Sequence, residues 1–326
     1  MKKLILALGD ANVDLIAPVK DFPEEGGEVL LRRLEWRAGG SAANFSVAIA
    51  RLGRGSGFIG RVGDDALGRF LMEDFKREKV DISQLQVDRE VGTGLTFVLV
   101  SKRGERTMFG YRGANVRLSA EELDLDYVKG AEVLHVSGYA LLEDPQRRAA
   151  LTAMRAAKKA GVFISMDVGI PAARGARVLS PSLRSVDLLF LNEREAASLM
   201  RIRKAEDAVR RILKLGPSTV ALKRGRRGCL IATEGGMLRS PAFPVRAVDT
   251  TGAGDAFDAG FVFGIVEGWG IEKAARLANA AGALCAGRIG ARTGLPSMQE
   301  LMDFLKRFGD THPGDVAELS TFKANN

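Results

Sequence analysis

Apolar and polar positions alternate along the chain in a pattern that predicts a succession of short strands and helices. Residues 4–8 are all apolar and predict a buried first strand, while apolar side chains at helical spacing in residues 65–78 predict an amphipathic helix. Between these two elements we expect a helix rich in small residues at 42–52 and a strand at 58–62.

Two stretches interrupt this alternation. Residues 14–37 are extended, with a β-rich stretch at 29–31. Residues 93–112 predict a hairpin, whose strands at 95–100 and 106–111 flank a polar turn. Antiparallel strands do not belong in the middle of a parallel sheet, so we expect these two stretches to form a small β lid beside the main sheet.

From about residue 130 the pattern becomes regular. Strands are expected at 133–137, 162–167, 187–192, 219–222 and 229–232, and helices at 145–159, 193–200, 205–215, 256–267, 271–286 and 297–308. Strands that alternate with helices predict an α/β fold with a mostly parallel central sheet, covered by helices on both faces. We expect one domain over 1–308, with the lid inserted in it, and a polar tail at 309–326.

Composition narrows the class of protein. The chain has 326 residues, of which 46% are apolar, so it can form a sizeable core, and its two cysteines exclude a disulfide scaffold. The net charge is +8, but the basic residues are scattered and only three Tyr and two Trp are present, which favours a solvated surface over nucleic-acid binding. No apolar run approaches the ~20 residues of a membrane span, and we expect a cytoplasmic protein.

The most informative segment is 248–257, where a glycine-rich turn leads into an apolar helix. The free N–H groups of residues 252–255 would point at an anion, helped by the helix dipole. Asp255 would repel a phosphate there. It is therefore either an acid that stabilises the helix N-terminus or a general base that takes a proton from an attacking hydroxyl, and its position after Gly-Ala-Gly favours the base.

Two further segments predict a site for a polyol. Gly39 and Gly40 open a helix whose first turn contains small side chains and the amide of Asn44, which suits hydrogen bonding to hydroxyls; ordinary close helix packing is the alternative. Asn12 and Asp14 follow the first strand, and ligands of open α/β sheets bind at the carboxyl ends of strands. A polar turn is the alternative for this pair.

Together these segments resemble the ribokinase (PfkB) family of carbohydrate kinases. Residues 39–44, with Gly53 and Gly63, fit the first signature of the family, and residues 249–255 through Val262 fit the second. The resemblance covers essentially the whole chain. It implies a ribokinase-like three-layer α/β/α fold with a β lid, and an ATP- and Mg²⁺-dependent kinase that phosphorylates a hydroxyl, most simply a primary one, of a small sugar.

The resemblance also implies a role for individual residues. Asp255 would be the catalytic base, with Gly252, Ala253 and Gly254 as the anion hole for the transferred phosphoryl group. The residues that would hold the sugar are Asn12, Asp14, Gly39, Gly40, Ser41 and Asn44. Those near the nucleotide would be Asn192, Lys223, Gly225, Gly228 and Asn279, with Glu195 positioning hydrated Mg²⁺. Asp249 and Thr251 match a monovalent-cation site, for which K⁺ is the candidate.

The lid strand carries the residues that would distinguish substrates. Arg106, Tyr111 and Arg112 are expected to face the sugar, and an arginine there could bind a carboxylate or phosphate. The pair of Asn12 and Asp14 suits a neutral sugar such as ribose or fructose. We rank a neutral sugar first, a ketodeoxy sugar acid such as 2-keto-3-deoxygluconate second, and a nucleoside third.

Three other expectations complete the sequence picture. ADP is the alternative to ATP as phosphoryl donor. A non-catalytic sugar- or nucleotide-binding regulator on the same fold is the rival function, against which the intact Asp255 and anion hole argue. The resemblance implies a homodimer through the β lid, and we expect no nucleic-acid or membrane partner.

Overall fold

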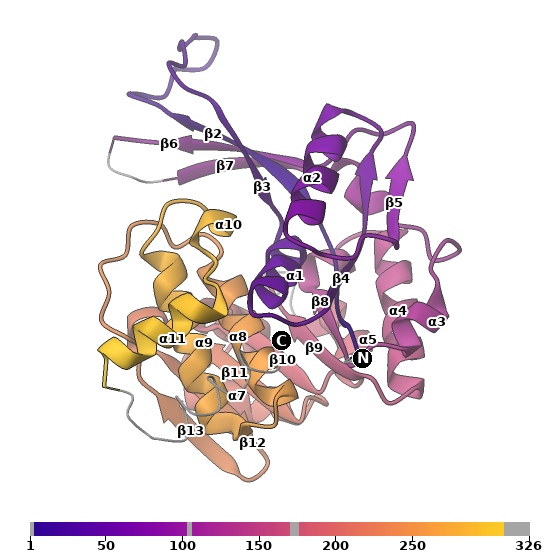
Figure 1. Ribbon diagram of the computed structural model, residues 1–326, viewed down its shortest axis with the longest axis vertical. Coiled ribbons are helices and arrows are strands. Elements are labelled where there is room, and N and C mark those ends of the chain that lie inside the picture. The colour runs from indigo at the N-terminus through magenta and orange to yellow at the C-terminus, as the bar shows by residue number, and fades with distance from the viewer. Residues whose placement is uncertain (1–2, 103–105, 170–175, 310–326) are drawn as a thin grey trace.

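The fold contains two β-sheets of unequal size (Figure 1). The computed structural model describes residues 3–102, 106–169 and 176–309, so the turn at 103–105 and nearly all of the polar tail lie outside the described residues. Among the described residues, nine strands form the large sheet. In spatial order they are β13 (Gly236–Ser240), β12 (Cys229–Thr233), β11 (Thr219–Lys223), β10 (Leu188–Asn192), β9 (Phe163–Asp167), β8 (Val133–Ser137), β1 (Ile5–Leu8), β4 (Ser56–Gly63) and β5 (Leu85–Asp88).

The large sheet is parallel except at one edge. Every pairing from β11 across to β5 is parallel, whereas β11, β12 and β13 pair antiparallel. The carboxyl ends of the parallel strands therefore lie along the same edge of the sheet, where the loops that follow them can build a binding site.

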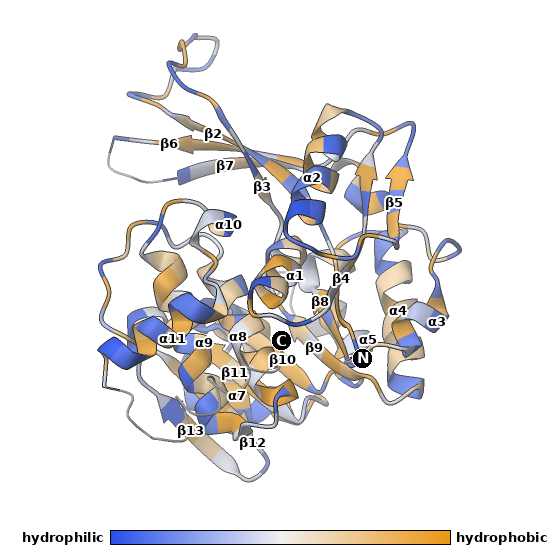
Figure 2. Cartoon of the chain, in the orientation of Figure 1, coloured by the Kyte–Doolittle hydropathy of each residue, from blue (hydrophilic) through white to orange (hydrophobic). Residues whose placement is uncertain are grey.

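Helices cover both faces of this sheet because its strands are apolar on both sides. Ile5 and Ala7 of β1 belong to one buried cluster, and Leu6 and Leu8 belong to the other. The helices on the first side are α1 (Ser41–Arg51), α2 (Ala66–Arg77), α8 (Ala253–Val266), α9 (Gly270–Ala286) and α11 (Met298–Arg307). Those on the second side are α3 (Leu125–Lys129), α4 (Gln146–Lys159), α5 (Ala176–Leu183), α6 (Glu193–Met200) and α7 (Ala205–Leu213). Figure 2 shows this division, with apolar strands inside and polar helix surfaces outside.

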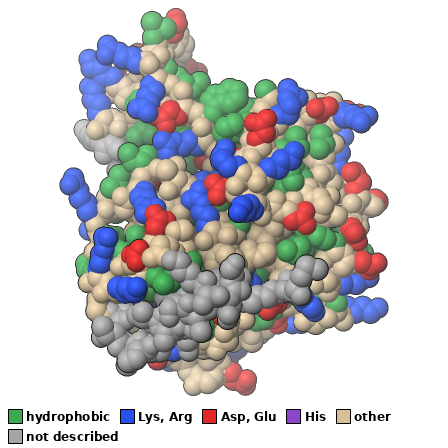
Figure 3. Space-filling view, in the orientation of Figure 1, with side chains coloured by type: hydrophobic (Ala, Val, Ile, Leu, Met, Phe, Trp, Pro, Cys, Tyr) green, Lys and Arg blue, Asp and Glu red, His purple; other side chains and the backbone are tan. Residues whose placement is uncertain are grey.

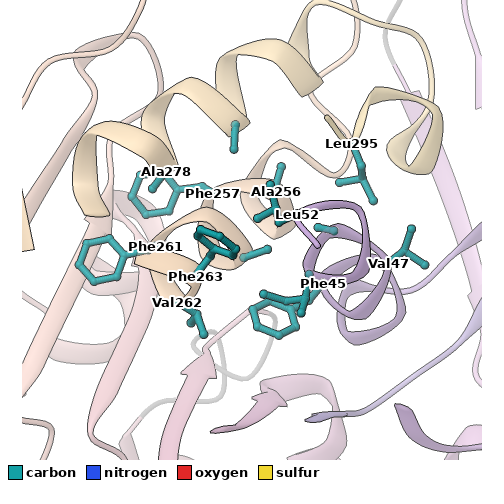
Figure 4. Packing of buried hydrophobic residues seen from close by; sticks show 14 of the residues in the cluster. Phe45, Val47, Leu52, Ala256, Phe257, Phe261, Val262, Phe263, Ala278 and Leu295 are labelled. Carbon is teal, nitrogen blue, oxygen red and sulfur yellow. The ribbon is translucent and has the colours of Figure 1, made fainter. Parts of the chain in front are cut away.

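The packing of α8 fixes the position of its N-terminus. Phe45 of α1 and Phe257, Phe261 and Phe263 of α8 are buried together with α9 (Figure 4). A Cβ at Gly264 would lie 2.8 Å from Ala274 Cα, so α8 and α9 approach each other too closely for a side chain there. As a result, α8 is held rigidly against its neighbours and its first turn lies beside the first turn of α1.

The small sheet projects from the body formed by the large sheet and its helices (Figure 1). Its strands, in spatial order, are β3 (Glu35–Gly39), β2 (Asn12–Pro18), β6 (Leu95–Val100) and β7 (Arg106–Tyr111). Trp36, Leu15, Phe97 and Phe109 are successive neighbours across these strands and form an apolar stripe on one face. The other face, with Asp14 and Arg106, faces the body.

The architecture confirms the predicted fold class, although some short segments differ from the prediction. The hairpin 95–100 and 106–111 was predicted to the residue. The β-rich stretch at 29–31 is not a strand, because these residues lie in a loop where Leu30 is 84% exposed. Strands β5 and β13 were not predicted, since each is short and only half-buried.

The distribution of charged side chains can be followed on one face of the molecule. Figure 3 shows one face of the molecule, on which Lys and Arg side chains alternate with Asp and Glu. This distribution agrees with the solvated surface expected from the scattered basic residues. Over the described part of the chain, no helix combines the length and apolar character needed to cross a membrane.

Candidate active site

A pocket of about 490 Å³ opens between the small sheet and the helix N-termini of the body. Its walls bring together segments that are far apart in the sequence: strands β2 and β7, the first turn of α1, and the turn that precedes α8. The predicted site residues that line it are Asn12, Asp14, Gly40, Ser41, Asn44, Arg106, Tyr111, Asp249, Thr251, Gly252 and Asp255.

Asp255 lies in the first turn of α8 at the wall of this pocket. Ser41 Oγ donates a hydrogen bond to its Oδ1 at 2.9 Å, and Asn44 Nδ2 donates to its Oδ2 at 2.8 Å. Burial raises the pKa of Asp255 to about 6, although these hydrogen bonds act in the opposite direction. The carboxylate is thus fixed in orientation, and its pKa suits a base that works near neutral pH. Ser41 and Asn44, predicted as sugar ligands, contact this carboxylate.

Glycine is required at the two helix starts that meet here. Gly252 caps α8 in the left-handed region, with φ of 77°, and a Cβ there would lie 2.9 Å from Ala291 Cα. Gly40 caps α1 with φ of 97°, and a side chain would collide with the carbonyl oxygen of Asp10. At both helix starts, close packing against another part of the backbone therefore requires glycine.

Asn12 and Asp14 reach the pocket from alternate positions of β2. Asn12 Oδ1 accepts a hydrogen bond from the buried Asn115 Nδ2 at 2.9 Å, which fixes its amide. Burial raises the pKa of Asp14 to about 6. Gly39, the cross-strand neighbour of Asn12, leaves room for that carboxylate, because a Cβ there would lie 2.8 Å from Asp14 Cγ.

The pocket also contains arginines, each of which is already paired. Both Arg112 Nε and Nη2 donate to the Asp10 carboxylate at 2.9 Å, so this pair is bidentate. Arg106 forms an ion pair with Asp249, and Arg37 forms one with Glu35 at 2.6 Å. Tyr111, which follows Arg106 on β7, is about half exposed at the pocket rim.

Asp249 is the centre of a set of hydrogen bonds. Its Oδ1 accepts from Thr251 N at 2.9 Å, and its Oδ2 accepts from Gly290 N at 2.7 Å. Although burial opposes this effect, these donors and Arg106 hold the pKa of Asp249 below its ordinary value. Asp249 is therefore a charged carboxylate that joins the turn before α8, the segment at residue 290 and the small sheet.

The residues predicted near the nucleotide lie away from this pocket, at the ends of β10 and β11. Asn192 and Glu195 form a capping box at the start of α6, with hydrogen bonds of 2.9 and 2.8 Å. Gly228 ends the turn between β11 and β12 with φ of 77°, and Gly225 begins it with φ of 57°. Asn279 is buried and donates to Ser240 Oγ at 3.0 Å.

Lys223 joins this region to the first turn of α8. Its Nζ lies 2.9 Å from Asp167 Oδ1 and 3.1 Å from both carboxylate oxygens of Asp258. Burial would lower the pKa of Lys223, but the two carboxylates hold it above its ordinary value. A Cβ at Gly254 would lie 3.4 Å from this ammonium, so a fixed positive charge sits beneath the predicted anion hole.

Lys223 carries one positive charge, whereas three carboxyl groups lie near it, those of Asp167, Asp258 and Glu195. Burial and the nearby Asp167 raise the pKa of Glu195 above its ordinary value. Asp167 and Glu195 therefore form an electronegative pair that a hydrated cation would stabilise. In the described part of the chain, no group of three or more His, Cys, Asp or Glu side chains is arranged to hold a metal ion by itself.

The site also contains residues that were not predicted from the sequence. Asp10, Asn115 and Asp167 bind or orient predicted site residues, and Arg37 lines the pocket. Asp10 follows the buried strand β1, and Asp167 is the last residue of β9, so both lie at carboxyl ends of strands, which is a signal that sequence alone offers. Asn115 and Arg37 carry no such signal, because tertiary contacts alone bring them to the site.

Comparisons with known proteins agree with this geometry. The family model described as "pfkB family carbohydrate kinase" matches residues 2–298. The chain is 35% identical over 302 residues to the ATP-dependent ribose-1-phosphate kinase of Halopiger xanaduensis, covering 92% of this chain and 97% of that one. It is 35% identical over 317 residues to the fructokinase of Klebsiella pneumoniae, covering 92% and 99%. A putative ribokinase II from E. coli, in complex with ATP and Mg²⁺, superimposes with a TM-score of 0.83 at 27% identity, over 94% of this chain and 100% of that one.

Proposed function

Since the chain belongs to the pfkB family of carbohydrate kinases and is itself a sugar kinase, we propose that it transfers the terminal phosphoryl group of ATP to a primary hydroxyl of a small sugar. The observation that carries this proposal is the setting of Asp255. Its carboxylate is held by hydrogen bonds from Ser41 and Asn44 at the wall of the pocket, beside the N-terminus of α8.

Asp255 acts as the general base in this proposal. A sugar hydroxyl in the pocket donates its proton to the carboxylate as the hydroxyl oxygen bonds to the terminal phosphorus of ATP, and the bond from that phosphorus to the departing ADP breaks. The N–H groups of Gly252 and Gly254 form the proposed anion hole, because the α8 dipole and the absence of bulky side chains favour a phosphoryl group there. Ala253, the third residue predicted for it, donates its N–H to Thr250 O at 3.2 Å. Lys223, 3.4 Å from the Cβ position of Gly254, adds positive charge below it.

Mg²⁺ fits the carboxylates at the ends of β9 and β10. Glu195 and Asp167 would hold it through water, since Mg²⁺ keeps several waters and binds through one or two carboxylates plus phosphates. Burial and the repulsion from Asp167 both raise the pKa of Glu195, and this repulsion supports a cation beside the two carboxylates. When bound with ATP, the ion would neutralise charge on the phosphates. The turn at Gly225 and Gly228 and the nearby Asn279 are the proposed neighbours of the nucleotide.

We propose a neutral sugar as the substrate. Among the described residues that line the pocket, each arginine is already paired with a carboxylate, so an acidic substrate would have to break an ion pair. Asn12 and Asp14, by contrast, offer a fixed amide and a carboxylate to hydroxyl groups. The fructokinase of Klebsiella pneumoniae, by its name, acts on such a sugar.

An anionic sugar is the second candidate. The observation that favours it is Arg106, which is a quarter exposed and extends from β7 into the pocket. A phosphate group of the sugar could bind this guanidinium in place of the Asp249 carboxylate. The relative from Halopiger xanaduensis is named for ribose 1-phosphate, which carries a primary hydroxyl for the reaction.

The small sheet is proposed to act as a lid. It carries Asn12, Asp14 and Arg106, so its contacts with the substrate would close the pocket and exclude water, which competes as an acceptor.

The same sheet would join two copies of the chain through its apolar stripe. Localisation in the cytoplasm, and one domain over 1–308 that carries the lid, complete the proposal.

A screen of acceptors tests the function. ADP release is measured with ATP and Mg²⁺ over fructose, ribose, ribose 1-phosphate, 2-keto-3-deoxygluconate and nucleosides, and again with ADP as donor. We expect the highest kcat/KM on a neutral sugar with ATP, and a kcat that is lower by roughly 10²- to 10⁴-fold in Asp255→Asn. A preference for ribose 1-phosphate would establish the second candidate. Nucleotide binding without turnover of any acceptor would favour a regulator.

A further inference from the structure

Two arginines of the small sheet contact Asp249 and the segment at 289–293 that is bonded to it. Arg106 of β7 forms its ion pair with the Asp249 carboxylate. Arg37 of β3 donates from Nη1 to Ile289 O at 3.1 Å and to Thr293 Oγ1 at 3.4 Å. Ile289 O and Thr293 Oγ1, before and after Gly290 in the chain, thus receive hydrogen bonds from Arg37, while the N–H of Gly290 itself donates to Asp249.

These oxygens are the ones that a monovalent cation would need. A dehydrated K⁺ is held by several carbonyl and carboxylate oxygens that replace its water. The Asp249 carboxylate accepts from two backbone N–H groups and from Arg106. The Cys285 thiol contacts the carbonyl oxygens of Thr251 and Ala291 at 3.6 and 3.7 Å. The residues present therefore do not fit the cation that Asp249 and Thr251 suggested.

We propose that Arg106 replaces the monovalent cation, so that this kinase works without K⁺. A guanidinium is always charged and matches a carboxylate in geometry, so it neutralises Asp249 as a bound cation would. Arg37 holds the segment on the other side of Gly290. This inference rests on the proposed kinase function and goes beyond it, because it assigns a charge at the anion hole to a side chain of the lid.

The arrangement couples the lid to catalysis. Arg106 lies on β7, and Asp249 is three residues before Gly252, which caps α8. When the small sheet lies against the body, the guanidinium cancels a negative charge beside the place where the phosphoryl group is transferred. When the sheet moves away, the uncompensated Asp249 carboxylate repels the phosphates. Arg106 is therefore a positioning residue that makes transfer depend on closure.

The test compares Arg106→Met with Lys102→Met. Lys102 belongs to the same hairpin, is 57% exposed and pairs only loosely with Asp21 at 3.7 Å, so its variant removes one positive charge from the lid without touching Asp249. Both variants are melted to establish that they fold. Activity of each full-length protein is measured in tetramethylammonium buffer, with and without KCl, and Tl⁺ binding is followed by ²⁰⁵Tl NMR without substrate.

We expect the wild type and Lys102→Met to have equal kcat with and without K⁺, and to show no saturable Tl⁺ binding. Arg106→Met should lose about 10- to 100-fold in kcat, with KM little changed, and K⁺ should restore most of it while Tl⁺ now binds. Strong activation of the wild type by K⁺ would overturn the proposal. So would a loss in Arg106→Met that appears only in KM, or that K⁺ does not rescue. If no sugar is turned over, Tl⁺ binding still decides the question, separately from the proposed function.

Discussion

At the scale of single residues, two carboxylates of the pocket have an unusual proton affinity. Burial raises the pKa of both Asp14 and Asp255 to about 6. Asp14 comes from strand β2 and Asp255 from helix α8, so the fold brings together two carboxyl groups that are costly to ionise. Such groups are typical of sites where charge is needed for binding or proton transfer.

The pH dependence of kcat/KM follows from these two values. Both carboxylates must be deprotonated, Asp255 to accept a proton and Asp14 to accept hydrogen bonds from the sugar. Because kcat/KM reports groups of the free enzyme, it should fall below about pH 6 with a slope that approaches two on a logarithmic plot. In Asp14→Asn the slope should approach one. A flat profile down to pH 5 would contradict the assignment of Asp255 as base.

Replacing Asp255 by Asn should separate stability from activity. We expect a loss of roughly 10²- to 10⁴-fold in kcat, because the amide cannot accept the hydroxyl proton. The folded pKa is raised to about 6 from 3.8, so the folded state binds more protons than the unfolded state in this window, and stability falls as pH rises through it. The variant lacks this penalty and should gain about 1–3 kcal/mol in urea unfolding at pH 7. At pH 4 the difference should nearly vanish, and an equal gain at both pH values would refute the cause.

At the scale of elements, the site depends on two helix N-termini that meet. The first turn of α1 supplies Ser41 and Asn44, and the first turn of α8 supplies Asp255, which they hold. Phe45 and Phe257 pack beside these turns, so the apolar core fixes the distance between them (Figure 4). The polar constellation is therefore as rigid as the helix packing beneath it.

Gly252→Ala tests this dependence. The residue has φ of 77°, and its new Cβ would lie 2.9 Å from Ala291 Cα, so the turn before α8 must shift. We expect a loss of about 1–3 kcal/mol in stability and of at least about tenfold in kcat. Gly161→Ala is the matched control for backbone strain, since Gly161, in the turn between α4 and β9, has φ of 76° with open space around its Cβ position. Equal kcat losses in the two variants would mean that strain alone, and not the anion hole, is responsible.

Sequence alone predicted the regular elements well and the contacts between them poorly. Helical and alternating patterns located the elements because burial imposes those periods locally, as for the hairpin of β6 and β7. Glycines and the DTTGAGD turn marked the pocket, since a close backbone approach requires residues of that type. What could not be predicted was which oxygens each polar side chain would meet. Ser41 and Asn44 were predicted as sugar ligands, and their contact with Asp255 depends on how two distant helices pack.

At the scale of the whole molecule, the small sheet has two unlike faces. One lines the pocket with polar side chains such as Asp14 and Arg106. The other presents the apolar stripe, in which Trp36 is 49% and Phe109 is 61% exposed. Trp36 packs edge-on against Phe70 of α2, with ring centroids 6.2 Å apart, but Phe109 extends beyond that contact. Contiguous exposed apolar surface is typical of protein–protein contacts, which is why we propose the dimer through this face.

Phe109→Asp should therefore dissociate the proposed homodimer. A buried charge in the stripe would be costly to desolvate, so light scattering after gel filtration should give about twice the chain mass for the wild type and the chain mass for the variant. Val87→Asp, on the edge strand β5 of the large sheet, introduces the same charge at a 42% exposed apolar residue and should stay dimeric. Phe109 and Arg106 lie on the same strand, β7. The monomeric variant should therefore also lose part of its kcat, because a second copy no longer holds its lid in place. A wild type that is monomeric at micromolar concentration would contradict this interface, while leaving the arrangement around Asp255 untouched.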